Sequence, residues 1–164
     1  DLVLNALPEL SAKLPDLQFL HLSGERDLAK VRAAHAHLGR RSVVRPFFSE
    51  IEFALGAATL AVARSGASTL AELAAMRLPS ILIPFPAATD DHQFHNASAF
   101  ARSGAALLLP QRTTTPQVLA RETLKLTTNP VRREAMATAL AHWHAPDAAA
   151  RIAQRIVGAH FDAG

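Results

Sequence analysis

Two kinds of apolar pattern follow one another along the chain. Leucines recur at roughly helical spacing through residues 2–13, whereas runs such as 17–22 and 60–63 are short, continuous and followed by turn residues. The first pattern predicts a helix and the second predicts buried strands. We expect helices over residues 2–13, 26–38, 50–55, 68–76 and 90–103, from 115 onward, and over 130–142 and 146–160. We expect strands over residues 17–22, 42–45, 60–63, 80–83 and 105–109.

This alternation of strands and helices is typical of an α/β fold with a doubly wound parallel sheet. The strands lack the alternating pattern of a half-exposed sheet, so we expect helices to cover both faces. No repeat or linker divides the sequence, which predicts one domain over residues 1–164. The first element is a helix, whereas such a unit usually begins with a strand and a glycine-rich turn. The first strand is therefore expected to lie outside this sequence.

Composition narrows the class of protein further. Hydrophobic residues make up 49% and charged residues 19%, which is typical of a globular domain. Lys and Arg outnumber Asp and Glu by only 17 to 14, and no basic run is interleaved with aromatics, so a nucleic-acid partner is not expected. The absence of cysteine excludes disulfides and thiolate metal sites. It also fits the cytoplasm, as does the lack of a signal-peptide pattern.

A strand, a Ser-Gly turn and a helix follow each other in the segment Ala61-Val-Ala-Arg-Ser-Gly-Ala-Ser-Thr-Leu-Ala-Glu72. Gly66 permits a tight turn, and the unpaired N–H groups at the helix start, helped by the helix dipole, attract an anion. Ser65, Ser68 and Thr69 add hydroxyl donors. These features suit a diphosphate held without a metal ion. Taken alone, the segment is more typical of an ordinary strand–turn–helix corner capped by serine.

Glu72 lies about one turn inside that helix. A carboxylate there can accept two hydrogen bonds from a ribose diol. Taken alone, it is more typical of a solvated helix glutamate that the N-terminal dipole stabilises.

A second polar group occupies the start of the helix over residues 90–103. Thr89 or Asp90 is expected to cap this helix, with Gln93 as the reciprocal partner of a capping box. His92 and Asn96 are four residues apart, so both can project with Gln93 from one end of the helix. Ligands of open α/β sheets bind at the edge where the strands end. Imidazole and amide groups suit sugar hydroxyls, although an ordinary polar helix face is an equal alternative.

A metal site is a weaker interpretation of the same segment. His92 and His95 are three residues apart and lie near Asp90 and Asp91. A third ligand at suitable spacing is not evident. We therefore expect neither a metal ion nor another cofactor.

Taken in order, these segments resemble the MurG family of bacterial N-acetylglucosaminyltransferases, glycosyltransferase family 28. The resemblance is specific because a Ser-Gly helix start, a glutamate, a Leu-Pro strand and a His-Gln helix occur in sequence. Weaker similarity covers almost the whole chain. The segments that carry it are Arg64-Ser-Gly-Ala-Ser-Thr-Leu-Ala-Glu-Leu-Ala-Ala75, Leu78-Pro-Ser-Ile-Leu-Ile-Pro-Phe85, Asp90-Asp-His-Gln-Phe-His-Asn-Ala97 and, less closely, Val44-Arg-Pro-Phe-Phe48 and Pro146-Asp-Ala-Ala149.

The resemblance implies the GT-B fold, in which two Rossmann-like domains enclose a cleft and the C-terminal one binds UDP-GlcNAc. Residues 1–164 would be that donor domain. Glu72 would hold the ribose hydroxyls, and Phe48 would help form the uracil pocket, largely through its backbone. The implied donor-binding set is Phe48, Arg64, Ser65, Gly66, Ala67, Ser68, Thr69, Glu72, His92, Gln93 and Asn96. Within this set, residues 65–69 would cradle the diphosphate. GlcNAc would be contacted by His92, Gln93 and Asn96. Arg64 has either a binding or a structural role.

The implied reaction transfers GlcNAc from UDP-GlcNAc to lipid I with inversion, forming lipid II for peptidoglycan. It would tie the protein to cell-wall biogenesis, cell shape and cell division, at the inner face of the membrane as a peripheral protein. The family's glycine-rich loop before the first helix is missing here, and so is the acceptor domain, which would bind the lipid-linked acceptor and supply the base. We therefore expect this chain to bind donor weakly and not to turn over alone. By the same resemblance, residues 149–160 would expose an apolar stripe.

Three alternatives remain open from the sequence. In the first, the chain is a donor subunit that needs a separate membrane-bound partner. In the second, it is a related GT-B domain that uses another sugar or acceptor. In the third, it is a non-catalytic nucleotide-sugar-binding module.

Overall fold

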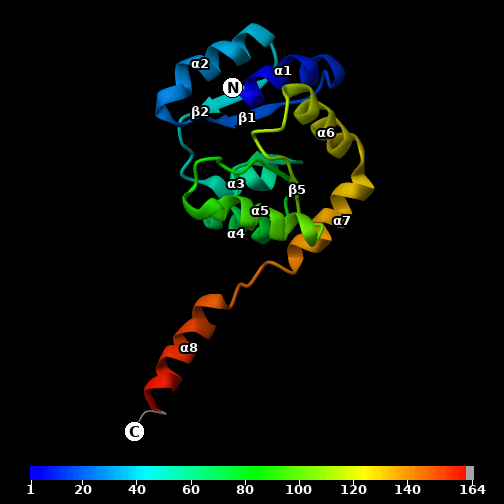
Figure 1. Ribbon diagram of the computed structural model, residues 1–164. Coiled ribbons are helices and arrows are strands. Elements are labelled where there is room, and N and C mark those ends of the chain that lie inside the picture. Colours follow the sequence, from blue (N-terminus) through cyan, green and yellow to red (C-terminus); the bar gives the residue numbers. More distant parts are fainter. Residues whose placement is uncertain (162–164) are drawn as a thin grey trace.

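The computed structural model describes residues 1–161, which form an α/β domain of short strands surrounded by helices (Figure 1). Residues 162–164, the end of the domain expected from the sequence, lie outside the described residues. The strands are β1 (Phe19–Leu22), β2 (Ser42–Arg45), β3 (Ala61–Ala63), β4 (Ser80–Leu82) and β5 (Leu107–Leu108). The helices are α1 (Leu2–Lys13), α2 (Gly24–Leu38), α3 (Ile51–Ala57), α4 (Ala67–Ala75), the short 3-10 turn η1 (Thr89–Asp91), α5 (His92–Arg102), α6 (Pro116–Thr128), α7 (Pro130–Ala141) and α8 (Ala148–Phe161).

Every strand pair is parallel, which confirms the predicted fold class. Within residues 1–161 the strands form two sheets, one with the order β1-β2 and one with the order β3-β4-β5. Phe19 pairs with Ser42 in the first sheet, and Ala61 pairs with Ser80 in the second. The continuous sheet that the pattern suggests is thus divided between β1 and β3.

The strands next to this division are less buried than the sequence predicts. Leu20 and Leu22 of β1 are 46% and 38% exposed, and Val62 of β3 is 38% exposed. The expectation that helices cover both faces of every strand is wrong for β1, because Leu20 and Leu22 alternate along the strand and so lie exposed on one face of it. The predicted first strand outside this sequence stays a prediction.

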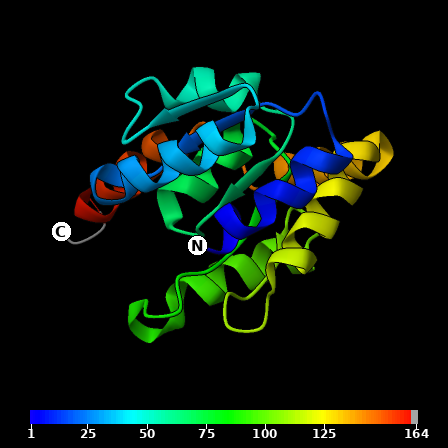
Figure 2. The ribbon, with the colours of Figure 1, turned by 90° about the horizontal axis from the view of Figure 1, so that it is seen from above.

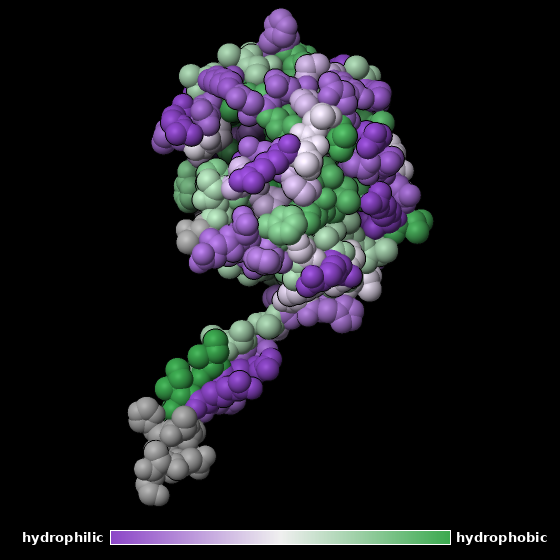
Figure 3. Space-filling view, viewed as in Figure 1, coloured by the Kyte–Doolittle hydropathy of each residue, from purple (hydrophilic) through white to green (hydrophobic). Residues whose placement is uncertain are grey.

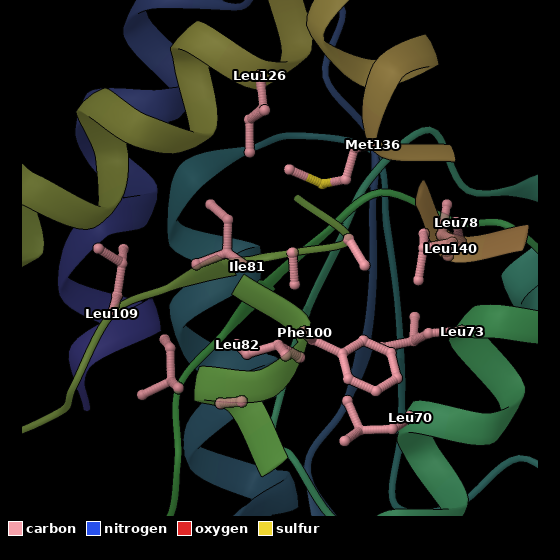
Figure 4. Packing of buried hydrophobic residues seen from close by; sticks show 14 of the residues in the cluster. Leu70, Leu73, Leu78, Ile81, Leu82, Phe100, Leu109, Leu126, Met136 and Leu140 are labelled. Carbon is pink, nitrogen blue, oxygen red and sulfur yellow. The ribbon is translucent and has the colours of Figure 1, made fainter. Parts of the chain in front are cut away.

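The hydrophobic core is centred on β4, whose three residues are all buried. Ile81 and Leu82 are fully buried, and Figure 4 shows Ile81 on the side of Leu126 and Leu82 on the side of Phe100. Successive residues of a strand face opposite sides, so β4 joins the two halves of the core. The buried cluster draws on α1, α4, α5, α6 and α7.

The helices around this core begin and end largely where local chemistry predicts. Gly39 ends α2 with a φ of 62°, the left-handed conformation expected of a glycine C-cap. Thr115 caps α6 by accepting a hydrogen bond from Val118 N–H, and Pro116 occupies the first turn. Seen from above, α1 and α6 lie side by side (Figure 2), and the two helices are in contact.

Helix α8 extends away from the rest of the domain (Figure 1). Its apolar and hydrophilic residues lie along opposite sides (Figure 3), with Ile152, Ile156 and Val157 between 57% and 60% exposed. These side chains confirm the predicted apolar stripe as far as the described residues extend. No helix within residues 1–161 is both long and apolar enough to cross a membrane.

Candidate functional site

The two polar segments that the sequence singles out follow neighbouring parallel strands. Helix α4 begins directly after β3, and a loop over residues 83–91 leads from β4 into α5. Because β3 and β4 are parallel neighbours, their carboxyl ends meet at one edge of the sheet. This edge is where open α/β sheets bind their ligands.

The start of α4 presents backbone N–H groups without helical partners. Gly66 is the N-cap, with extended backbone and no side-chain capping bond. The first helical hydrogen bond runs from Leu70 N–H to the Gly66 carbonyl, so the amides of residues 67–69 have no acceptor within the helix. Ala67 and Ser68 are exposed. This helix start can therefore accept an anion.

Ser65 connects the start of α4 to the start of α5. Its side chain is fully buried, and its Oγ donates a hydrogen bond of 2.7 Å to the Gln93 carbonyl. In return, Asn96 Nδ2 donates a hydrogen bond of 3.2 Å to the Ser65 carbonyl. The two segments are therefore brought together, but the Ser65 hydroxyl and one side of the Asn96 amide are engaged within the chain.

Gln93 has a different local role from the one expected. Its Oε1 accepts a hydrogen bond of 3.1 Å from Phe85 N–H, across the β4–α5 loop. The N-cap of α5 is Asp91, without a side-chain capping bond, rather than Thr89 or Asp90. The predicted capping box is wrong because Asp90 and Asp91 both adopt left-handed backbone, with φ of 51° and 50°, which moves the helix start to His92.

Arg64 reaches across to the end of β4. One guanidinium nitrogen donates hydrogen bonds of 2.9 Å and 3.1 Å to the carbonyls of Ile83 and Pro84. The guanidinium carbon lies 5.4 Å from the centre of the Phe85 ring, within the range of a cation–π contact. Partial burial lowers the pKa of Arg64 below its ordinary value, and the guanidinium stays charged.

The remaining site residues lie around the same edge. Glu72 is partly buried on α4, and His92 is exposed as the first residue of α5. Phe48 is partly buried in the loop that follows β2, again at the carboxyl end of a parallel strand. No group of three or more potential metal-binding side chains converges within the part of the chain that the structure describes.

One contributor to this site has no signal in the sequence. Arg112, in the loop after β5, donates a hydrogen bond of 3.3 Å to the Pro86 carbonyl. The two residues are 26 positions apart, and nothing in the local pattern around Arg112 indicates the contact.

The fold and the candidate site together are typical of a Rossmann-like α/β domain, with a helix start suited to an anion beside a polar helix start. Comparison with known families makes the assignment specific. The glycosyltransferase family 28 C-terminal domain matches residues 1–152. The chain belongs to this family.

Curated relatives of the chain carry one common name. A protein of Anaeromyxobacter sp. (strain K), named UDP-N-acetylglucosamine--N-acetylmuramyl-(pentapeptide) pyrophosphoryl-undecaprenol N-acetylglucosamine transferase, is 41% identical over 92% of this chain and 39% of its own length. The protein of that name from Sorangium cellulosum (strain So ce56) is 43% identical over 93% of this chain and 38% of its own length. The chain thus spans about two fifths of these relatives.

A solved structure supports the same assignment. The chain is similar to Acinetobacter baumannii MurG, with a TM-score of 0.80 and 28% identity over 95% of this chain and 48% of the MurG chain. The predicted resemblance to the C-terminal domain of MurG-like GT-B enzymes is therefore confirmed. Which residues bind a ligand stays a prediction.

Proposed function

We propose that residues 1–164 form the donor-binding domain of an inverting glycosyltransferase that transfers GlcNAc from UDP-GlcNAc to a lipid-linked muramoyl acceptor. The observation that carries this proposal is the convergence of the α4 start and the α5 start at the carboxyl edge of β3 and β4. The names of the relatives support the choice of donor and acceptor.

The diphosphate of the donor would bind at the start of α4. The amides of Ala67, Ser68 and Thr69 would donate to it, and the small Gly66 would let the phosphates approach the backbone. As the bond to the sugar breaks, negative charge develops on the leaving UDP. Preorganised N–H groups stabilise such charge without rearranging, so the same contacts would assist both binding and departure.

The nucleoside and the sugar would lie on either side of the diphosphate. Glu72, partly buried on α4, would accept hydrogen bonds from the ribose hydroxyls, and Phe48 would border the uracil. His92, Gln93 and Asn96 would meet the sugar from the start of α5. Gln93 retains its Nε2 for this contact while its Oε1 is held by Phe85 N–H, and this arrangement fixes the direction in which the amide donates.

The acceptor and the base would come from outside this chain. The relatives are named for an undecaprenol-linked acceptor, which supports a reaction at the inner face of the membrane. A base there would take the proton of the acceptor hydroxyl as this attacks the anomeric carbon. The chain alone is therefore expected to bind donor and not to turn over.

Calorimetric titration of the chain with UDP-GlcNAc, UDP-Gal and UDP tests the proposal. We expect UDP-GlcNAc to bind more tightly than UDP-Gal. Glu72→Ala should weaken the binding of both UDP and UDP-GlcNAc by about a hundredfold, since two hydrogen bonds to a charged acceptor are lost. Glu134→Ala is the control, because Glu134 is also a helix glutamate but is exposed and lies on α7.

Each outcome of this titration has a distinct meaning. Binding that Glu72→Ala leaves unchanged would remove the ribose assignment. A preference for UDP-Gal would move the proposal to a related enzyme with another donor. Absence of binding by any UDP compound would contradict the donor-domain proposal itself.

A further inference from the structure

We propose that Arg64 is a positioning residue: its guanidinium holds the β4–α5 loop, residues 83–91, in the shape that the sugar-contacting side chains need, and does not bind the diphosphate. This inference rests on the proposed function. The sequence leaves both a binding role and a structural role open for Arg64, and the inference assigns it the structural role.

The guanidinium stands where the sheet ladder ends. Ile83 N–H donates a hydrogen bond of 2.8 Å to the Ala63 carbonyl, and this is the last backbone bond between the two chain segments at that end. In a longer parallel ladder the next bond would be accepted by the Ile83 carbonyl. Here the chain after β3 turns into α4, and the side chain of Arg64 donates hydrogen bonds to the carbonyls of Ile83 and Pro84 instead.

The start of the loop, residues 84–86, has few backbone donors of its own, and its one internal bond is accepted by the Phe85 carbonyl from Ala88 N–H at 3.2 Å. Pro84 and Pro86 have no N–H, so Phe85 carries the only backbone donor in residues 84–86. That donor goes to Gln93 Oε1. Arg64 donates a hydrogen bond to the Pro84 carbonyl, and Arg112 donates one to the Pro86 carbonyl. Side chains from outside residues 84–86 therefore bond the Pro84 carbonyl, the Phe85 N–H and the Pro86 carbonyl.

The shape of the loop determines where α5 begins. Asp90 and Asp91 have φ of 51° and 50° immediately before His92, a conformation that non-glycine residues adopt infrequently. Such backbone persists where the surrounding structure imposes it. Arg64 anchors the far end of the loop, and Gln93 ties it to α5, so a loosened anchor would displace the first turn of α5.

The contacts of Arg64 identify a substitution that tests the positioning role. Both carbonyl bonds use the same terminal nitrogen, and the Phe85 ring lies 5.4 Å from the guanidinium carbon. A lysine at this position would keep the positive charge, but its side chain is shorter and lacks the planar guanidinium that lies near the Phe85 ring. Arg64→Lys therefore separates geometry from charge.

The test compares UDP with UDP-GlcNAc binding by calorimetry for wild type and Arg64→Lys. We expect the variant to bind UDP-GlcNAc about tenfold more weakly and UDP within about twofold of wild type, because the loop affects the sugar side and the diphosphate cradle is intact. Arg26→Lys on α2 is the matched control, since the Arg26 side chain is 94% exposed. Equal losses for UDP and UDP-GlcNAc would instead assign Arg64 to the diphosphate and overturn the proposal.

A second measurement on the free chain keeps the two proposals separable. In Arg64→Lys, the amide of Phe85 should exchange its hydrogen faster, whereas the amide of Leu109, bonded to the Leu82 carbonyl in the core, should exchange as in wild type. Unchanged exchange at Phe85 would overturn the positioning role whether or not donor binds. Wild type that fails to bind UDP-GlcNAc, with faster Phe85 exchange in the variant, would contradict the proposed function alone.

Discussion

Replacing Ser65 by alanine tests the connection between the two halves of the site. The Ser65 side chain is fully buried, and its Oγ donates to the Gln93 carbonyl at 2.7 Å, which joins the segment after β3 to the first turn of α5. Alanine fits the space without new clashes and removes only the hydroxyl. The hydrogen bond from Asn96 to the Ser65 carbonyl does not depend on the side chain and remains.

The expected loss follows from this geometry. A neutral hydrogen bond contributes about 0.5–1.5 kcal/mol net to stability, and the buried site lets little water replace the lost donor. We therefore expect Ser65→Ala to lower the free energy of unfolding by about 1 kcal/mol, which corresponds to a fall of about 2–4 °C in Tm for a domain of this size.

Urea unfolding followed by the fluorescence of Trp143 measures this loss. Trp143 is the single tryptophan, and it stacks on Phe100 of α5 with ring centres 4.2 Å apart. Ser68→Ala is the control, because Ser68 lies at the same helix start but is exposed; it should change stability by less than about 0.5 kcal/mol. Equal effects of the two substitutions would refute the connection between α4 and α5.

Two further predictions concern stability away from the site. Burial lowers the pKa of His21 and His35 below the ordinary 6.5, with the His35 charge and then the N-terminal amine as further causes for His21. Below about pH 6.5 the unfolded chain then binds more protons than the folded chain. The free energy of unfolding is therefore highest above about pH 6.5 and falls as the pH drops through the pKa values of the folded histidines. Urea midpoints that stay constant between about pH 7.5 and 5.5 would contradict this. Asn129→Ala should destabilise the domain by about 1 kcal/mol, because Asn129 Oδ1 accepts the Arg132 N–H at 2.9 Å and caps α7. A Tm equal to that of wild type in a thermal melt would show that this cap contributes nothing.

Features that depend on neighbouring residues could be predicted from the sequence. The end of α2 follows from Gly39, and the start of α6 follows from Thr115 and Pro116, because a capping residue acts within a few positions. The parallel fold class follows from the alternation of apolar patterns. The burial of β1 could not be predicted in this way, since it depends on which strand lies beside it, and the pairing of β1 ends at β2 among residues 1–161.

The sequence indicated that the two segments of the candidate site meet at one sheet edge, but it did not indicate the contacts between them. The pattern placed residues 64–69 and 92–96 at one sheet edge, as the parallel pairing of β3 and β4 requires. It could not indicate that Ser65 is bonded to Gln93, 28 positions away, or that Gln93 is bonded to Phe85. A side chain that can contact a ligand can equally satisfy the backbone of a distant loop, and only the tertiary structure distinguishes the two.

This double use of side chains implies a difference between the two parts of the proposed donor site. At α4 the donors are backbone amides of residues 67–69, whose positions depend on the helix and hardly on side-chain identity. At α5 the groups are side chains, and those of Gln93 and Asn96 are already held at one end by the chain. Substitutions should therefore change the preference among sugars more readily than the affinity for UDP. The two ligands that differ only by the sugar, UDP and UDP-GlcNAc, are for this reason the most informative pair for every variant of this site.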